Sequence, residues 1–237
     1  MSDDPQRRDW ARSYLRRQGR TTRAQKRAIR ELWPEFGLTW SHDAPLNLPE
    51  AFGRDAHTVL EIGFGTGDAL LHLAALHPEW NVLGVETHRP GVGAALKALG
   101  EQGLTNARIV RGDAIELLAY HLDDRAVDEV CVFFPDPWPR TKDVGRRIVR
   151  PWLAELLSRR VRPGGSLHLA TDVADYAAHM VEVMDASPAW RNRHPDTVWA
   201  PRPSWRPITR YERRAHEEGR RVRDLSYALD GARHAEG

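Results

Sequence analysis

The sequence predicts an α/β fold in which an open, mostly parallel sheet carries helices on both faces. Between residues 57 and 186, short apolar runs rich in Val, Ile and Leu alternate with longer runs whose apolar residues recur at helical spacing. This alternation is typical of parallel sheets, because a parallel connection needs a crossover, which is usually a helix. A glycine-rich turn, EIGFGTGDA, lies between the first expected strand and the first expected helix, as in Rossmann-like domains.

An N-terminal helical extension is expected before this domain. Residues 1–20 are polar and Arg-rich, and we expect a flexible basic arm there. Residues 21–56 are expected to hold a helix and a linker. The stretch TTRAQKRAIRELW begins on a Thr that can cap a helix and has apolar residues at helical spacing, and the segment after it is punctuated by Pro. The main domain is expected over residues 57–230 and a C-terminal tail over residues 231–237.

Within the main domain, the expected strands are apolar and β-branched, and the expected helices show helical periodicity. The expected strands are 57–63, 81–86, 107–113, 127–134, 166–172 and 221–229. The expected helices are 68–77, 90–102, 146–161, 175–186 and 208–219, with a short helix after residue 113. A Pro-Gly-Gly turn at 163–165 is expected to lead into the fifth strand. Ligands of such sheets bind at the carboxyl ends of the strands.

Length and composition limit the class of protein. A chain of 237 residues suits one domain with extensions. The single cysteine, Cys131, lies in an apolar run, which excludes an intrachain disulfide framework and fits a reducing compartment. The N-terminus lacks the apolar core of a signal peptide, and no apolar stretch approaches the ~20 residues that span a bilayer. We therefore expect a soluble cytoplasmic protein that does not contact membranes.

Charge is sorted along the chain, although the net charge is only +2. Residues 1–37, 138–162 and 191–223 are basic, with ten, eight and ten Lys/Arg against five, two and four Asp/Glu. Residues 55–137 carry thirteen acids against five cations. The pattern favours a polyanion at the periphery and a different ligand at the centre, with solvated charged faces as the alternative.

The glycine-rich turn has an acid just ahead of it. Glu61, Gly63, Gly65 and Gly67 give ExGxGxG, whereas a dinucleotide fingerprint is GxGxxG, so a nicotinamide oxidoreductase is excluded. A carboxylate at Glu61 would repel pyrophosphate but attract the amino group or the sulfonium of S-adenosylmethionine. Gly63 and Gly65 would let the backbone approach that ligand without a Cβ in the way.

Two further acids end the next two strands. Glu86 lies 21 residues after Gly65, a spacing that suits a carboxylate accepting hydrogen bonds from both ribose hydroxyls. Asp113 could accept a hydrogen bond from an adenine amino group, or it could cap the short helix that follows. Acids at three successive strand ends indicate a class I methyltransferase cofactor site. The eleven histidines are scattered, and no metal site is expected.

The fourth strand ends in FFPDPWPR, a loop that its prolines stiffen around Asp136. Methyl transfer from a sulfonium needs a nucleophilic lone pair, and guanine N7 has one at neutral pH without a general base. Asp136 could stabilise the charge that the purine gains or hold its N1–H and amino edge, and an Asp-Pro turn residue is the alternative. The cations that follow, among them Arg140, Arg146 and Arg147, are expected to contact nucleotide phosphates.

From about residue 12 to residue 229, the chain resembles the bacterial tRNA (guanine-N7-)-methyltransferases. The resemblance is carried by EIGFGTGDALLHLA, GVETHRPGVG, RGDA, FPDPWPR, RPGGSLHLATD and ITRYERRAHEEGRRVRDL. FPDPWP and TRYE…G…DL are specific to this family, whereas ExGxGxG is shared by methyltransferases in general. The resemblance implies a class I methyltransferase (Rossmann-like) fold with a seven-stranded sheet. It implies methylation of guanine N7 in the tRNA variable loop, with S-adenosyl-L-homocysteine as the second product.

The resemblance also implies roles for single residues. It implies S-adenosylmethionine contacts from Glu61, Glu86, Asp113 and Asp136, the last also catalytic. It implies tRNA contacts from Arg140, Asp172, Thr209, Arg210, Tyr211 and Glu212. From the residues alone, Asp172 could instead cap the helix after the fifth strand, and residues 209–212 could form an ordinary amphipathic turn.

Two other functions stay open at this point. A class I methyltransferase acting on another RNA, a protein or a small molecule would have the same cofactor site but no need for three basic segments. A non-catalytic RNA-binding protein is disfavoured, because all four acids at the strand ends are present. The sequence leaves both a monomer and a homodimer open.

Overall fold

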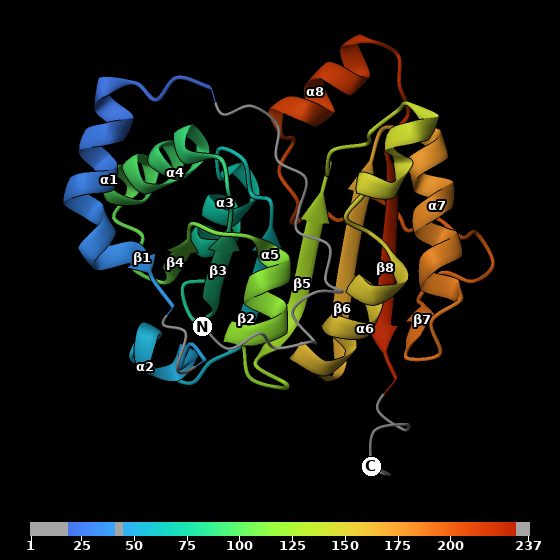
Figure 1. The fold of residues 1–237 in the computed structure, drawn as a ribbon, viewed down its shortest axis with the longest axis horizontal. Coiled ribbons are helices and arrows are strands. Elements are labelled where there is room, and N and C mark those ends of the chain that lie inside the picture. Colours follow the sequence, from blue (N-terminus) through green and yellow to red (C-terminus); the bar gives the residue numbers. More distant parts are fainter. Residues whose placement is uncertain (1–18, 41–44, 231–237) are drawn as a thin grey trace.

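The computed structural model describes residues 19–40 and 45–230. Most of the expected arm at 1–20 and the whole expected tail at 231–237 therefore lie outside the described residues. The described part is an α/β structure in which one sheet carries helices on both faces, as the sequence predicts (Figure 1).

Within the described residues, the sheet has eight strands in the order β1-β4-β3-β2-β5-β6-β8-β7. They are β1 (Gly37–Leu38), β2 (Thr58–Ile62), β3 (Asn81–Val85), β4 (Ala107–Val110), β5 (Val127–Phe133), β6 (Val161–Thr171), β7 (Trp190–Asn192) and β8 (Arg223–Leu229). Neighbours from β1 to β6 pair in parallel, and β8 runs antiparallel to both β6 and β7. The predicted strand count of seven is wrong by one, because two residues of the expected linker, Gly37 and Leu38, pair with β4. A strand of two residues is too short to show periodicity in the sequence.

The predicted helices occur in the predicted order, with two differences: an unpredicted short helix at residues 48–52 lies in the expected linker, and the helix expected from residue 146 begins later. They are α1 (Arg23–Phe36), α2 (Leu48–Phe52), α3 (Asp68–Leu76), α4 (Arg89–Gln102), α5 (Ala114–Glu116), α6 (Pro151–Arg160), α7 (Ala174–Asp185) and α8 (Arg210–Glu217), with a π-helical turn at Leu117–His121 and a 3-10 turn at Thr141–Arg146. The helix predicted from residue 146 begins only at Pro151. Proline is favoured in a first helical turn and disfavours helical backbone at the residue before it, Arg150.

The predicted helical extension is present as α1 and packs on α4. A capping box starts it: the Thr22 hydroxyl accepts from the Gln25 amide at 3.2 Å, and the Thr22 amide donates to the Gln25 side chain at 2.8 Å. Gly93 of α4 allows the close approach, since an added Cβ would lie 2.7 Å from the Cβ of Gln25. Helix α1 thus lies along the β4 side of the sheet (Figure 1).

Two apolar clusters cover the two faces of the sheet. One joins the strands to α1, α3 and α4, and the other joins them to α6, α7 and the turn after α5. Strands β2 and β3 are buried along their whole length, as expected for the centre of a parallel sheet. Cys131 is buried on β5, and burial raises the pKa of its thiol. Among the described helices, none is long and apolar enough to cross a membrane.

The Pro-Gly-Gly segment at 163–165 lies inside β6 instead of preceding it. Val161 already pairs with Val127, and the register then shifts so that Ser166 pairs with Glu129. Gly164 has a positive φ of 81°, which suits a glycine at a bulge. The strand is therefore longer than predicted, because a bulge replaces the expected turn.

Candidate functional site

Four acids lie along one edge of the sheet, where the parallel strands β4, β3, β2 and β5 end side by side. Glu61 is the penultimate residue of β2, Glu86 follows β3, and Asp113 and Asp136 come three residues after β4 and β5. The strands are paired in parallel register, so their carboxyl ends share this edge, which is the upper one in Figure 1. The predicted gathering of the four acids is confirmed, and their ligand contacts stay predictions.

Glu61 is a buried carboxylate, only 4% exposed, and its Oε2 has no hydrogen-bond partner among the described residues. Burial and then the nearby carboxylate of Asp68 raise the pKa of Glu61 to about 8. A buried carboxylate with an unused oxygen suits a cationic ligand group, because such a partner would offset the cost of desolvation. This fits the predicted attraction of an amino group or a sulfonium.

The glycine-rich turn after β2 is a tight loop that only glycine accommodates without strain. Gly63, Gly65 and Gly67 all have positive φ, at 73°, 59° and 90°. The Glu86 carboxylate holds this loop, since one oxygen accepts from the Gly65 amide at 2.9 Å. The start of α4 packs on the loop as well, and a Cβ at Gly91 would lie 2.1 Å from the Gly65 carbonyl oxygen.

Asp113 and Glu86 both accept backbone hydrogen bonds. Asp113 accepts from the Ile115 amide at 2.8 Å, so the alternative that it caps the short helix is confirmed. The second oxygen of Glu86 accepts from the amides of Thr87 and His88 at 2.7 and 2.8 Å. These bonds fix the direction of both carboxylates at the sheet edge, whereas contacts with ribose or adenine stay predictions.

The proline-rich loop after β5 is strained and presents Asp136 to solvent. Phe134 and Trp138, on either side of Asp136, have positive φ values of 50° and 44°, which are uncommon for bulky residues. Such strain persists only where the surrounding structure imposes it, and it is often found at functional sites.

Arg147 lies beneath this loop and holds it. Its Nε donates to the Pro137 carbonyl at 2.9 Å, it forms an ion pair with Asp175, and its guanidinium lies 4.7 Å from the Tyr176 ring centroid. Only 2% of Arg147 is exposed, so the predicted phosphate contact of this residue is wrong: its guanidinium faces the interior. Arg146, by contrast, remains partly exposed and stacks on Trp138 at 5.0 Å. Arg140 is exposed in the same loop.

The start of α8 reaches the glycine-rich and proline-rich loops. Thr209 caps α8 through its hydroxyl, which accepts from the Glu212 amide at 3.3 Å. Tyr211 stacks on Phe134, with ring centroids 6.3 Å apart and planes 18° apart. The same ring would lie 3.8 Å from a Cβ added at Gly65. Three segments that are far apart in the sequence therefore meet around a half-exposed tyrosine, which sequence reasoning alone did not predict.

Glu212 lies in a buried charge cluster, so the predicted direct contact of this residue with tRNA is wrong. Its side chain is fully buried and forms ion pairs with Arg202 at 2.7 Å and with Arg206 at 2.6 Å. Arg206 also pairs with Asp224 on β8 at 3.1 Å, and its guanidinium lies 5.5 Å from the Phe134 ring. The cluster anchors α8 beneath Tyr211. The sequence carries no signal for Arg206, because its partners come from other elements.

Asp172 follows β6 and forms an ion pair with Arg220, just after α8. The predicted alternative, a cap on the next helix, is wrong, because Val173 is the N-cap of α7 and makes no side-chain cap bond. Arg210 is exposed, and its Nη2 donates to the Tyr211 hydroxyl at 2.8 Å. The tRNA contacts predicted for Asp172, Thr209, Arg210 and Tyr211 stay predictions. No cluster of metal-ligating side chains occurs in residues 19–40 and 45–230.

Comparison with known proteins gives similarity over most of the chain. A family model described as "Putative methyltransferase" matches residues 55–225. The chain is 45% identical to the tRNA (guanine-N(7)-)-methyltransferase of Hydrogenovibrio crunogenus, over 95% of this chain and 94% of that protein. It is 48% identical to the protein of that name from Xanthomonas oryzae pv. oryzae, over 92% of this chain and 86% of that protein.

Solved structures share the fold at much lower identity. The 16S rRNA (adenine(1408)-N(1))-methyltransferase of Catenulisporales acidiphilia, solved as a point mutant with its cosubstrate S-adenosylmethionine, superposes with a TM-score of 0.54 at 17% identity, over 83% of this chain and 94% of that one. The aminoglycoside resistance methyltransferase NpmB1 superposes with a TM-score of 0.53 at 18% identity, over 81% and 95% of the two chains. The α/β methyltransferase architecture predicted from the sequence is thereby confirmed.

Proposed function

Because this chain belongs to the family of tRNA (guanine-N(7)-)-methyltransferases, we propose that it transfers a methyl group from S-adenosylmethionine to N7 of a guanine in tRNA. The observation that carries the proposal is the convergence, at one sheet edge, of four acids, the glycine-rich loop and Tyr211. The other class I methyltransferase functions, with a different RNA, a protein or a small molecule as acceptor, become outcomes of the test.

The residues at this edge fit S-adenosylmethionine. The unused oxygen of buried Glu61 suits its amino group, and the backbone at Gly63 and Gly65 gives it a close approach. Glu86 and Asp113 are placed to accept from the ribose hydroxyls and from the adenine amino group. When bound, the cosubstrate supplies an electrophilic methyl group on a sulfonium.

The chain's own part in the reaction is to position the guanine and stabilise its charge. Guanine N7 has a free lone pair at neutral pH, so no general base is needed, and the purine gains positive charge as the bond forms. Asp136 stabilises that charge or accepts hydrogen bonds from the N1–H and amino edge. Tyr211 offers a face on which the base can stack, and the exposed Arg140 and Arg146 can hold phosphates.

Three finer points belong to the same proposal. The methylated guanine is expected in the variable loop, and the enzyme is expected to act in the cytoplasm, where its tRNA substrate is found. A monomer and a homodimer both stay open, and analytical ultracentrifugation of the full chain would distinguish them.

The test is nucleoside mass spectrometry of unmodified tRNA incubated with the enzyme and methyl-labelled S-adenosylmethionine. We expect labelled N7-methylguanosine, which reports donor, base and atom together. Label in another nucleoside, or in protein and not in tRNA, would contradict the proposal.

Two variants of Asp136 extend the test. Asp136→Ala should lower single-turnover methylation by about 100-fold or more while tRNA affinity changes little. Asp136→Asn removes the charge but keeps one acceptor oxygen. Activity as low as in the Ala variant indicates a charge role, and partial activity indicates that Asp136 orients the base. Full activity in both variants would show that Asp136 has no part in the reaction.

A further inference from the structure

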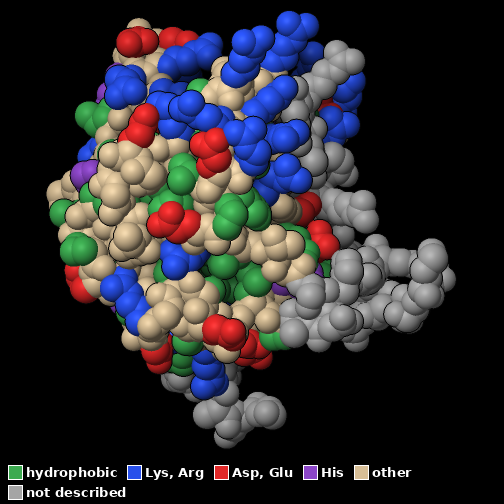
Figure 2. Space-filling view, turned by 90° about the vertical axis from the view of Figure 1, so that its left-hand side faces the viewer, with side chains coloured by type: hydrophobic (Ala, Val, Ile, Leu, Met, Phe, Trp, Pro, Cys, Tyr) green, Lys and Arg blue, Asp and Glu red, His purple; other side chains and the backbone are tan. Residues whose placement is uncertain are grey.

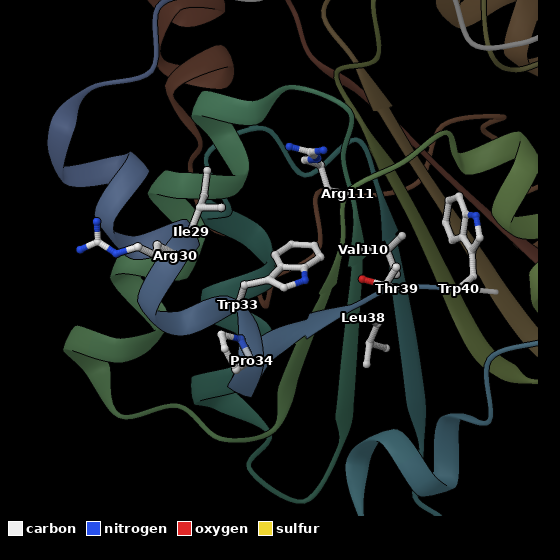
Figure 3. A pocket seen from close by; sticks show the side chains of 9 residues that line it. All are labelled: Ile29, Arg30, Trp33, Pro34, Leu38, Thr39, Trp40, Val110 and Arg111. Carbon is white, nitrogen blue, oxygen red and sulfur yellow. The ribbon is translucent and has the colours of Figure 1, made fainter.

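A groove of about 500 Å³ lies between α1, the edge strand β1 and the carboxyl end of β4 (Figure 3). It is lined by Ile29, Arg30, Trp33, Pro34, Leu38, Thr39, Trp40, Val110 and Arg111. Val110 is the last residue of β4, so the groove opens at the sheet edge that holds the four acids. Arg111 stands two residues before Asp113, which makes this groove a neighbour of the expected adenine end of the cofactor site.

Two glycines make room for the two tryptophans that form the groove. A Cβ at Gly37 would lie 2.2 Å from the Trp33 ring, so this indole packs directly on the backbone of β1. A Cβ at Gly112 would lie 2.2 Å from the Trp40 ring, and Trp40 also stacks on His121 with ring centroids 4.6 Å apart. Both aromatic rings are therefore held in place by the fold, whether or not a ligand is bound.

The two arginines that line the groove, Arg30 and Arg111, differ in their ion-pair partners. Arg30 forms an ion pair with Glu31 at 2.6 Å, and its guanidinium points away from Trp33 (Figure 3). Arg111 is exposed and forms no ion pair with a residue in the described part of the chain. Fixed aromatic faces beside an available guanidinium can stack a nucleobase and hold a phosphate.

The surrounding surface is complementary to a polyanion. Lys and Arg side chains gather at the upper end of the face that carries α1 (Figure 2). The exposed cations of this helix are Arg23, Lys26, Arg27 and Arg30. A groove with apolar walls on an uncharged face would suit a peptide, whereas this one opens onto a basic face and favours nucleic acid.

We propose that this groove binds one unpaired nucleotide of the tRNA while the target guanine lies at Asp136. The nucleobase stacks on Trp33 or Trp40, and a phosphate contacts Arg111. This inference rests on the proposed function. In the sheet order β4-β3-β2-β5, the groove and the proline-rich loop are three strand spacings apart, about 14 Å. A few nucleotides of one strand can span that distance, so the groove would set which nucleotide reaches Asp136.

The test uses two variants of the full chain, Trp33→Leu and Arg111→Gln. Trp80→Leu is the matched control. Trp80 is a half-buried tryptophan just before β3, so it lies at the amino ends of the strands, away from the acids at their carboxyl ends. Each variant is first checked by thermal unfolding. Affinity for an unmodified tRNA transcript is then measured at several salt concentrations, affinity for S-adenosylmethionine by calorimetry, and methylation at saturating tRNA.

We expect Trp33→Leu to weaken tRNA binding by about tenfold and leave its salt dependence nearly unchanged, because stacking is lost. Arg111→Gln should reduce the slope of log affinity against log salt by about 1, as for one lost phosphate contact. Cosubstrate affinity should not change, methylation at saturating tRNA should fall because the groove helps to position the target guanine, and Trp80→Leu should match the parent. Ultraviolet irradiation of the parent complex should join RNA to a peptide containing Trp33 or Trp40.

Other results would overturn the inference. Unchanged tRNA affinity in both variants would exclude a nucleotide site, and a loss confined to cosubstrate affinity would assign the groove to the methyl donor. Photoproducts that join the groove to another part of this chain, or to a second copy, would identify a protein occupant. If the parent protein does not methylate tRNA at all, the proposed function is wrong. If the parent methylates tRNA and both groove variants bind tRNA as it does, only the inference about the groove is wrong.

Discussion

Arg147 gives the sharpest test of how the proline-rich loop is held in position. The sequence predicts that Arg146 and Arg147 both contact phosphates, but the structure turns them in opposite directions. Arg147 donates to the Pro137 carbonyl and stacks on Tyr176 inside the protein, whereas Arg146 lies outside on Trp138. Substituting Arg147 by Ala should therefore lower stability and turnover and leave the salt dependence of tRNA binding unchanged.

The size of the effect follows from the contacts of Arg147. A hydrogen bond from a charged donor contributes about 1.5–3 kcal/mol, and a desolvated cation–π contact contributes up to about 2 kcal/mol. The ion pair with Asp175 is given no share, because the Asp175 side chain is 77% exposed and its attraction is screened by solvent. The expected loss is about 3 kcal/mol of unfolding free energy, or about 6–12 °C in Tm for a chain of this length. A loop displaced by about 1 Å would lower kcat by about 100-fold.

The assay compares Arg147→Ala with Arg146→Ala and with Arg147→Lys. Thermal unfolding by circular dichroism gives Tm, and single-turnover methylation at saturating tRNA, below the Tm of every variant, gives the rate. Arg146→Ala should keep the rate but reduce the salt slope of tRNA affinity by about 1. Arg147→Lys keeps the charge and should recover part of the stability and of the rate. A variant Arg147→Ala that unfolds and turns over like the parent, but has a lower salt slope, would refute the assignment and restore a phosphate contact.

Two further predictions concern buried charge. Glu61 has a folded-state pKa of about 8, above the value near 4.5 for an exposed Glu. Between these pH values the carboxyl ionises in the unfolded chain but stays protonated in the folded protein, so the free energy of unfolding falls as pH rises from about 4.5 to 8. Glu61→Gln should therefore raise Tm relative to the parent at pH 8 but not at pH 4.5, and should abolish uptake of S-adenosylmethionine in calorimetry. An equal Tm difference at both pH values would contradict the burial argument. Arg206→Met leaves the carboxylates of Glu212 and Asp224 buried without this partner, so unfolding in urea should show a loss of about 3–5 kcal/mol. A smaller loss in the triple variant with Glu212→Gln and Asp224→Asn would confirm that unpaired charge is the cause, whereas an unaltered midpoint in Arg206→Met would exclude it.

The gathering of the four acids could be predicted because it depends only on local pattern and topology. Each acid ends a short apolar run, and parallel strands joined by helices must end at one edge of the sheet. The strand that carries Glu61 and the strand that Glu86 follows are central and fully buried, so their apolar runs are clear in the sequence. β1 and β7 are absent from the predicted strands, because two and three residues are too few to show a period of their own.

The directions in which charged side chains point could not be predicted in the same way. Arg146 and Arg147 are identical neighbours, and contacts of Arg147 with Pro137 and with Asp175 and Tyr176 of α7 make one of them an interior residue. Glu212 lies in a largely polar run of residues, but its burial depends on Arg206 in the preceding loop and on Asp224 in β8. Such long-range pairing leaves no periodic signal in a single sequence.

The two corrected residues share one physical cause, which bears on how the site works. Both residues lie beneath loops at the carboxyl ends of the strands, and their charged groups add directional contacts that hold these loops. Arg147 holds the strained proline-rich loop from below, and the cluster of Arg206 and Glu212 holds the start of α8 under Tyr211. Buried pairs are costly to desolvate but highly directional, and a reaction that needs a base held in line with a methyl group depends on direction more than on stability. The basic segments should therefore divide into outward cations, whose loss changes salt dependence, and inward cations, whose loss changes stability and turnover.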